Sequence, residues 1–152
     1  NPAVTLAERL WGRIDTRGAF GYVAAQLAGA TLGVAAAHFM FAQPLLQLSA
    51  TPRAGWNLAG AEAIATFGLI TVIAISGRKK VEATPYAVAA YITSAYWFTS
   101  STSFANPAVT FARMFTDTFT GIRPDGLPGF LLGQLAGTLA AYALSAWILD
   151  ER

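Results

Sequence analysis

The pentapeptide Asn-Pro-Ala-Val-Thr occurs twice in this chain, at Asn1–Thr5 and again at Asn106–Thr110. Asparagine is a strong N-cap, because its side-chain oxygen accepts a hydrogen bond from a free backbone N–H of the first helical turn. Proline suits the first helical position, where its missing N–H costs no hydrogen bond. Each copy therefore predicts a helix start, and we expect short helices over residues 1–12 and 106–118. Both are too short to cross a bilayer, which takes about 20 apolar residues.

The rest of the chain is strongly apolar. Of its 152 residues, 55% are hydrophobic and 12% are charged, whereas soluble domains have roughly 25% charged residues. This composition indicates a membrane protein, and we predict one all-α domain over residues 1–152. Its four expected transmembrane helices run from Phe20 to Phe41, Trp56 to Gly77, Pro85 to Ser100 and Pro128 to Leu149.

The two short helices belong to an internal repeat. Each is followed by a polar link and then by an apolar span that carries Gln-Leu-Ala-Gly, at Gln26–Gly29 and at Gln134–Gly137. Three predicted spans separate the pentapeptides, so the short helices enter the membrane from opposite sides. Repeated halves with interrupted hydrophobic segments are typical of membrane proteins whose site lies at the bilayer midplane.

The basic residues predict which side faces the cytoplasm. This topology places seven of them on one side and three on the other, and the richer side is cytoplasmic by the positive-inside rule. The seven are Arg9, Arg13, Arg17, Arg78, Lys79, Lys80 and Arg152, and the three are Arg53, Arg113 and Arg123.

Few polar side chains lie inside the predicted spans. Glu62 is a candidate proton relay or an acceptor for backbone N–H groups of a re-entrant loop, and we favour the acceptor because its span has no second ionisable group. For Gln26 we expect a hydrogen bond between helices rather than a role in transport chemistry, and we assign Gln26 and Gln134, with Glu62, to structural support of the loops. His38 ends the first span, where a loop contact is more plausible than a metal, since one histidine without cysteine makes a poor metal site.

The topology predicts where two helix N-termini meet. Each N-terminus carries about half an elementary positive charge, so the pair raises a barrier to cations. We expect the two asparagine oxygens to be engaged as caps and the NH2 groups to point into a pore as donors. Such a site orients a water or hydroxyl oxygen and repels hydronium. The residues of this pore site are Asn1, Pro2, Ala3, Asn106, Pro107 and Ala108.

The doubled motif and its inverted placement resemble the aquaporin (major intrinsic protein) family, from the first Asn-Pro-Ala to the end of the chain. The resemblance implies an aquaporin-like inverted-repeat helical bundle in the inner (plasma) membrane, assembled as a homotetramer with one pore per subunit. Family members have two full helices before the first motif. The resemblance therefore implies a truncated channel with two half-helices and four of six spans.

The family's selectivity filter maps onto Ser94, Ser103 and Val109. Family members usually have arginine directly after the second motif, where this chain has Val109, and Arg113 lies one turn further on as an expected interface charge. Loss of that arginine implies a wider filter that passes glycerol-type polyols or hydroxylated metalloids. The run from Thr116 to Pro124 is also similar to bacterial aquaporin-like proteins associated with arsenic resistance, which implies arsenite or methylarsenicals as solutes.

Three other readings compete with a passive channel for water and small neutral solutes. A secondary transporter also uses broken helices, but it would need a coupling-ion site, for which Glu62 is the one carboxylate in a predicted span. The second alternative is a truncated chain that does not conduct. An enzyme is the least favoured, because one histidine and no cysteine supply neither a nucleophile–base pair nor a metal cluster. The expected partners are the lipid bilayer, water and small solutes, with no cofactor and no nucleic acid, since the ten basic residues are scattered among loops.

Overall fold

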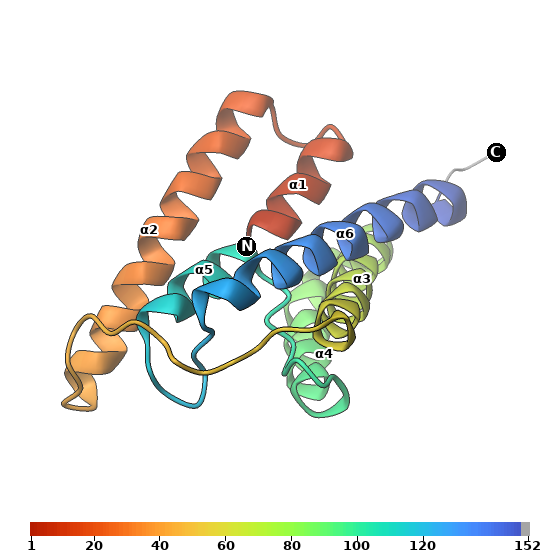
Figure 1. Cartoon of the computed structure of the whole chain (residues 1–152). Coiled ribbons are helices and arrows are strands. Elements are labelled where there is room, and N and C mark those ends of the chain that lie inside the picture. Colours follow the sequence, from red (N-terminus) through yellow and green to blue (C-terminus); the bar gives the residue numbers. More distant parts are fainter. Residues whose placement is uncertain (150–152) are drawn as a thin grey trace.

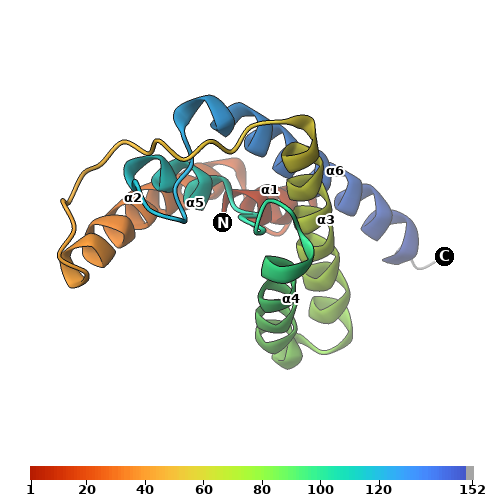
Figure 2. The same cartoon turned by 60° about the horizontal axis from the view of Figure 1, so that its bottom comes forward.

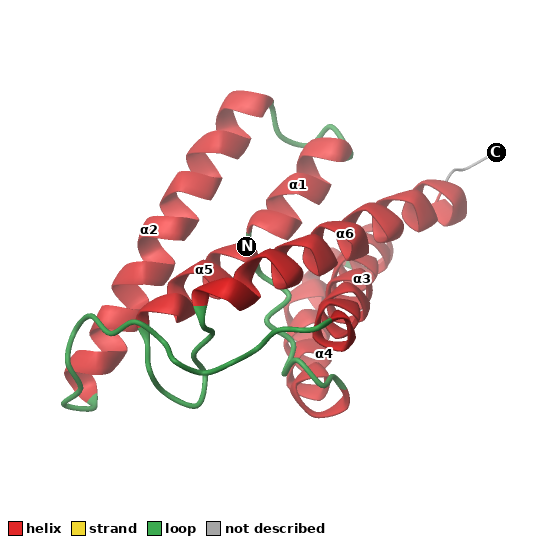
Figure 3. Ribbon diagram, viewed as in Figure 1, coloured by secondary structure: helices red, strands yellow, loops and turns green. Residues whose placement is uncertain are grey.

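The computed structural model describes residues 1–149 and contains helices and loops but no strand over that range (Figure 3). The α-helices are α1 (Pro2–Leu10), α2 (Thr16–Met40), α3 (Trp56–Lys79), α4 (Thr84–Phe98), α5 (Pro107–Ala112) and α6 (Leu127–Leu149). Three short 3-10 helices follow or precede them, η1 (Val81–Ala83), η2 (Arg113–Phe115) and η3 (Pro124–Gly126). The prediction of an all-α membrane fold is confirmed. Arg152, which entered the charge count, lies outside the described residues.

The short helices α1 and α5 begin next to each other and run apart. In both views they diverge from the point marked N (Figures 1 and 2). Asn1 caps α1 and Asn106 caps α5, each through its side-chain oxygen, and proline follows each cap. The sequence thus encodes both helix starts in the same way.

The second short helix is shorter than predicted. Regular α-helix ends at Ala112 and a 3-10 turn ends at Phe115, whereas the prediction extended to residue 118. Thr116 is extended (φ −137°, ψ 118°), and Ile122 N donates to the Arg113 carbonyl at 3.1 Å. The returning loop therefore satisfies a helix-end carbonyl that a continuing helix would have used.

Three segments are long and apolar enough to cross a membrane among the described residues: Thr16–Met40, Trp56–Lys79 and Pro124–Ile148. The remaining predicted span forms α4, which has 15 residues. At about 1.5 Å per residue, α4 is about 22 Å long and falls short of the roughly 30 Å hydrocarbon core. η1 extends it at its N-terminal end.

Helices α3 and α6 pack most closely, and glycine makes this possible. A Cβ added at Gly133 would collide with the carbonyl oxygen of Ala59, and one added at Gly137 would collide with that of Ala63. Small residues at membrane helix interfaces let two backbones approach in this way. Gly137 is the last residue of the second Gln-Leu-Ala-Gly, so this motif serves packing in that half of the molecule.

Helix α2 lies to one side of the other helices (Figure 1). Of its 25 described residues only His38 is buried. Its contacts are with α1, α5 and η2. A Cβ at Gly29, which ends the first Gln-Leu-Ala-Gly, would meet no atom within 4 Å. The two copies of the motif therefore differ in what they pack against within this chain.

The packing predicts unequal effects of adding one methyl group. Gly133→Ala should lower the free energy of unfolding by about 1–3 kcal/mol, because Ala59 backbone has to move. Gly29→Ala is the matched control and should leave stability unchanged or raise it, since alanine is the better helix former. Thermal unfolding in detergent measures both, and equal shifts for the two variants would contradict the close α3–α6 contact.

Candidate pore site

The starts of α1 and α5 are joined by a direct hydrogen bond. Asn1 Nδ2 donates to the carbonyl oxygen of Ala105 at 2.7 Å. Asn1 Oδ1 accepts from Ala3 N at 3.0 Å, and Asn106 Oδ1 accepts from Ala108 N at 3.0 Å and Val109 N at 3.3 Å. Both side-chain oxygens are thus used within the protein. The Asn1 NH2 group donates one N–H to Ala105 instead of directing both outward. The NH2 group of Asn106 has no hydrogen-bond partner among residues 1–149.

Each half-helix is held by the same pair of side chains. The motif threonine donates to the carbonyl of the motif asparagine, at 3.2 Å in the first copy and 2.9 Å in the second. Gln26 Nε2 then donates to Thr5 Oγ1 at 2.9 Å, and Gln134 Nε2 donates to Thr110 Oγ1 at 2.8 Å. Both glutamines belong to the Gln-Leu-Ala-Gly motifs. The internal repeat is therefore a repeat of contacts as well as of residues.

Glu62 supports the loop that leads into α5. Its side chain is fully buried, and its two oxygens accept from Phe104 N and Ala105 N, each at 2.8 Å. Gln134 Nε2 is a third donor at 2.6 Å. The carboxylate forms no ion pair with any residue from 1 to 149. A buried carboxylate is tolerated when such donors surround it.

This loop is strained. Thr102, Ser103 and Ala105 have φ of 64°, 48° and 44°. These values lie in the left-handed region of backbone conformations, which residues other than glycine rarely adopt. Each costs of order 1–3 kcal/mol and persists only where the surroundings enforce it. The two hydrogen bonds to Glu62 hold the amides of the consecutive residues Phe104 and Ala105. They turn the Ala105 carbonyl toward Asn1.

A pocket of about 290 Å³ lies where the two half-helices meet. Apolar side chains of α3 and α4 form one wall, and the opposite wall contains Asn1, Ser103, Asn106 and Val109. The Ser103 hydroxyl is buried without a hydrogen-bond partner. Two predicted filter residues and both motif asparagines therefore line one cavity.

Ser94 does not line this pocket. It is exposed, and its hydroxyl donates to the Ala90 carbonyl of the same helix at 2.9 Å. The α4 residues on the pocket wall are Val88, Ile92 and Tyr96. These three residues are four positions apart and therefore lie on one face of α4. Residue 94 is two positions from Ile92, which is about 200° around the helix, so it lies on the opposite face. The i, i+4 spacing of Val88, Ile92 and Tyr96 was the sequence signal for this face of α4, and mapping the family's filter onto Ser94 did not use it.

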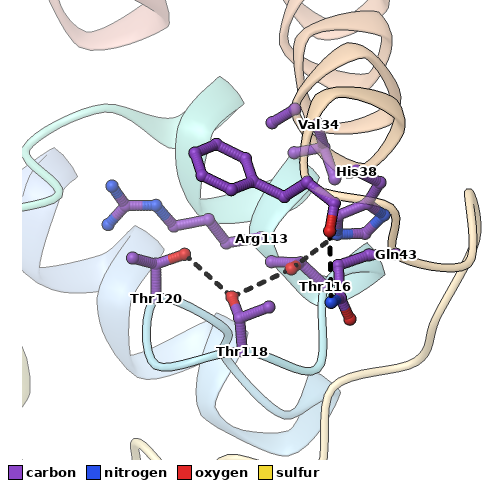
Figure 4. Close-up of a pocket in the computed structure, with 9 residues that line it drawn as sticks. Val34, His38, Gln43, Arg113, Thr116, Thr118 and Thr120 are labelled. Carbon is purple, nitrogen blue, oxygen red and sulfur yellow. Dashed lines mark hydrogen bonds between the residues drawn. The ribbon is translucent and has the colours of Figure 1, made fainter.

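Arg113 lies on the pocket wall, contrary to the expected interface charge. Its guanidinium lies over the ring of Phe104, 4.1 Å from the centroid. It also lines a second pocket of about 290 Å³ between α2 and the loop that follows η2, where its side chain extends beside Thr120 (Figure 4). One turn of helix separates it from Val109 in sequence, but the side chain reaches back to the same cavity.

His38 forms part of the second pocket and contacts two loops. Its Nδ1 lies 3.1 Å from the Leu45 carbonyl, which can only accept, so Nδ1 carries a proton. Its Nε2 lies 2.8 Å from Thr116 Oγ1. Hydroxyl contacts continue from Thr116 to Thr118 at 3.0 Å and to Thr120 at 3.3 Å (Figure 4). Among residues 1–149 no group of three potential metal ligands occurs.

Arg53 connects the loops at this end of the molecule. It donates to the carbonyls of Gly121 at 2.9 Å, Phe119 at 2.8 Å and Ser101 at 3.4 Å. Partial burial lowers the pKa of its guanidinium from the usual value, and the negative charge of Glu62 opposes that shift. Each of the three guanidinium nitrogens of Arg53 thus donates to a backbone carbonyl.

Comparison with known proteins places these features in a family. The Major intrinsic protein family matches residues 1–96. The chain is also 51% identical over 150 residues to Aquaglyceroporin AqpS of Rhizobium meliloti (strain 1021). The alignment covers 99% of this chain and 64% of that relative, so the chain spans less than two thirds of the relative's length. No solved structure matches the chain.

The loop geometry predicts the effect of neutralising its support. Glu62→Gln places an NH2 group against the backbone N–H of Phe104 or Ala105, so one buried donor loses its partner. The free energy of unfolding should fall by about 1–3 kcal/mol, and hydrogen exchange of these two amides should accelerate.

Glu8→Gln is the control, because Glu8 pairs with the partly exposed Arg13 at 3.0 Å. Its effect should stay below about 1 kcal/mol. Unchanged exchange at residues 104 and 105 in the Glu62 variant would contradict the assigned role.

Proposed function

Because the chain belongs to the major intrinsic protein family, we propose that it forms a passive transmembrane channel for water and small neutral solutes. One observation carries the proposal: the N-termini of two half-helices meet at a pocket lined by Asn1, Ser103 and Asn106. Donors and an acceptor converge there, and the described residues contain no group of three potential metal ligands. This favours passage of a solute over chemistry on it.

The proposed mechanism is electrostatic at one wall and apolar at the other. The paired helix ends place about half a positive charge each beside the pocket, which repels hydronium and metal cations. The Asn106 NH2 group and the Ser103 hydroxyl have no hydrogen-bond partner in the described protein and can bind a solute oxygen. The apolar α4 wall accommodates the carbon skeleton.

We propose glycerol-type polyols as the principal solutes. The similar protein from Rhizobium meliloti is named an aquaglyceroporin, and Val109 replaces the arginine expected after the second motif. A short apolar side chain there leaves room that a guanidinium would fill. Uncharged hydroxylated metalloids such as arsenite, and methylarsenicals, are similar to polyols in the hydroxyl groups they present.

The proposed setting is the inner membrane of a bacterial cell, with the protein multi-pass and homotetrameric. Large apolar side chains are exposed at the end of α2, where Phe39, Met40 and Phe41 are 79%, 72% and 75% exposed. Surfaces of this kind are expected to contact lipid or a neighbouring subunit. Glu62 does not favour a secondary transporter, because its oxygens are engaged by loop donors and it does not line the pocket.

Reconstitution in proteoliposomes tests the channel. Glycerol flux should rise linearly with the gradient and show no dependence on a proton gradient, whereas saturable, proton-driven uptake would favour a transporter. A chain that adds no water or glycerol flux to empty vesicles would contradict the proposal.

Val109→Arg tests the wide filter. Glycerol and arsenite permeability should fall about tenfold, which corresponds to a barrier increase of about 1.4 kcal/mol, since the new side chain fills the pocket. Val109→Ile is the control for size alone and should have a smaller effect. Unchanged glycerol and arsenite permeability in the arginine variant would show that residue 109 does not border the solute path.

A further inference from the structure

Arg113 lies at the junction of three cavities. It lines the pore pocket with Asn106 and Ser103 and the second pocket with His38. It also lines a third cavity of about 420 Å³ that Tyr96 and Phe119 border. One side chain therefore borders all three cavities.

The Arg113 guanidinium differs from those of Arg53 and Arg123 in its hydrogen bonding. Arg53 uses its N–H groups on three carbonyls, and Arg123 pairs with Asp125 through two contacts of 2.7 Å. The guanidinium of half-buried Arg113 has no hydrogen-bond or ion-pair partner among residues 1–149. An arginine has five N–H donors, so those that face the cavities are available to whatever occupies them.

The ring of Phe104 supports the Arg113 guanidinium on one face. The guanidinium lies 4.1 Å from the Phe104 centroid, a distance at which the ring face attracts a cation. Phe104 is itself held by its N–H bond to Glu62 at 2.8 Å and by packing on Phe130, with 5.0 Å between ring centroids. The Arg113 carbonyl accepts from Ile122 N, which holds the backbone end. The free donors are therefore presented by a rigid support.

A second polar group without a partner faces the same pocket. Ser103 is 2% exposed, and its hydroxyl has no hydrogen bond. A buried polar atom of this kind is rare unless something outside the protein satisfies it. Ser103 precedes Phe104 in the sequence and Arg113 follows it, and both residues line the same pocket. The pair points to an oxygen-bearing ligand.

We propose that Arg113, reaching back from the end of α5, supplies the fixed positive charge and hydrogen-bond donors of the pore mouth in place of residue 109. Arg113 is then a specificity-determining residue for hydroxylated neutral solutes. Resting on the proposed channel function, this inference assigns the recognition step. A polyol sheds water on entering the pore pocket, the Arg113 N–H groups donate to its oxygens, and the cation repels positively charged solutes.

The test is the ratio of glycerol to water permeability in proteoliposomes. Arg113→Met keeps an unbranched apolar stem but removes the charge and the donors of the guanidinium. The ratio should fall about threefold to tenfold, which is the effect of losing one hydrogen bond. Arg113→Lys keeps a cation and should retain most of the ratio. Arg123→Met is the control, because Arg123 is exposed and lines none of the three cavities.

Chemical rescue of a cysteine variant separates loss of the Arg113 charge from misfolding of the variant. The chain has no cysteine, so Arg113→Cys creates a single thiol. Attaching an aminoethylthio group restores an ammonium and should raise the ratio toward the wild-type value, whereas a neutral methylthio group should not. The same folded protein is compared before and after labelling.

Three results would overturn the inference. An unchanged ratio in Arg113→Met, equal effects of the charged and neutral labels, or a thiol at 113 that water-soluble reagent does not reach would each remove Arg113 from the solute path. Wild-type vesicles without glycerol or water flux would instead overturn the proposed function, and this inference with it.

Discussion

The loop of residues 99–105 runs through the interior of the protein without the regular hydrogen bonds of a helix. In a membrane protein such backbone is tolerated only where protein groups satisfy it or where it lines a cavity. Here Glu62 accepts from Phe104 N and Ala105 N, and Asn1 donates to the Ala105 carbonyl. Two of these three hydrogen bonds hold the left-handed residue Ala105, and the bond from Asn1 joins the start of α5 to the start of α1. The rest of the site depends on them.

Most polar groups near this loop are satisfied within the protein, which makes the exceptions informative. The repeated Thr–Gln contacts hold each half-helix, and close α3–α6 packing at Gly133 and Gly137 places Glu62 and Gln134 within reach of each other. The Ser103 hydroxyl and the Arg113 guanidinium have no hydrogen-bond partner in the described chain. A rigid, internally satisfied scaffold thus surrounds a few groups that are free for a solute.

Much of this arrangement was readable from the sequence. The two Asn-Pro helix starts and the apolar spans predicted the all-helical fold, because helix capping and hydropathy are local properties of the sequence. The end of α5 was predicted wrongly, since it depends on a distant amide, Ile122 N. The resemblance to the family assigned Ser94 to the filter, but the orientation of α4 about its axis decides which of its residues face the pocket. The reach of Arg113 was missed because it depends on the ring of Phe104.

The meeting of the two half-helix starts is most directly tested by a distance inside the membrane-embedded protein. Solid-state NMR on the lipid-reconstituted chain, with ¹⁵N in the Asn1 side chain and ¹³C in the Ala105 carbonyl, measures it. The Asn1 Nδ2 to Ala105 oxygen distance is 2.7 Å, and the carbonyl bond adds about 1.2 Å, so a nitrogen–carbon distance below about 4 Å is expected. A dipolar coupling too weak for that distance would separate the two helix starts and contradict the pore.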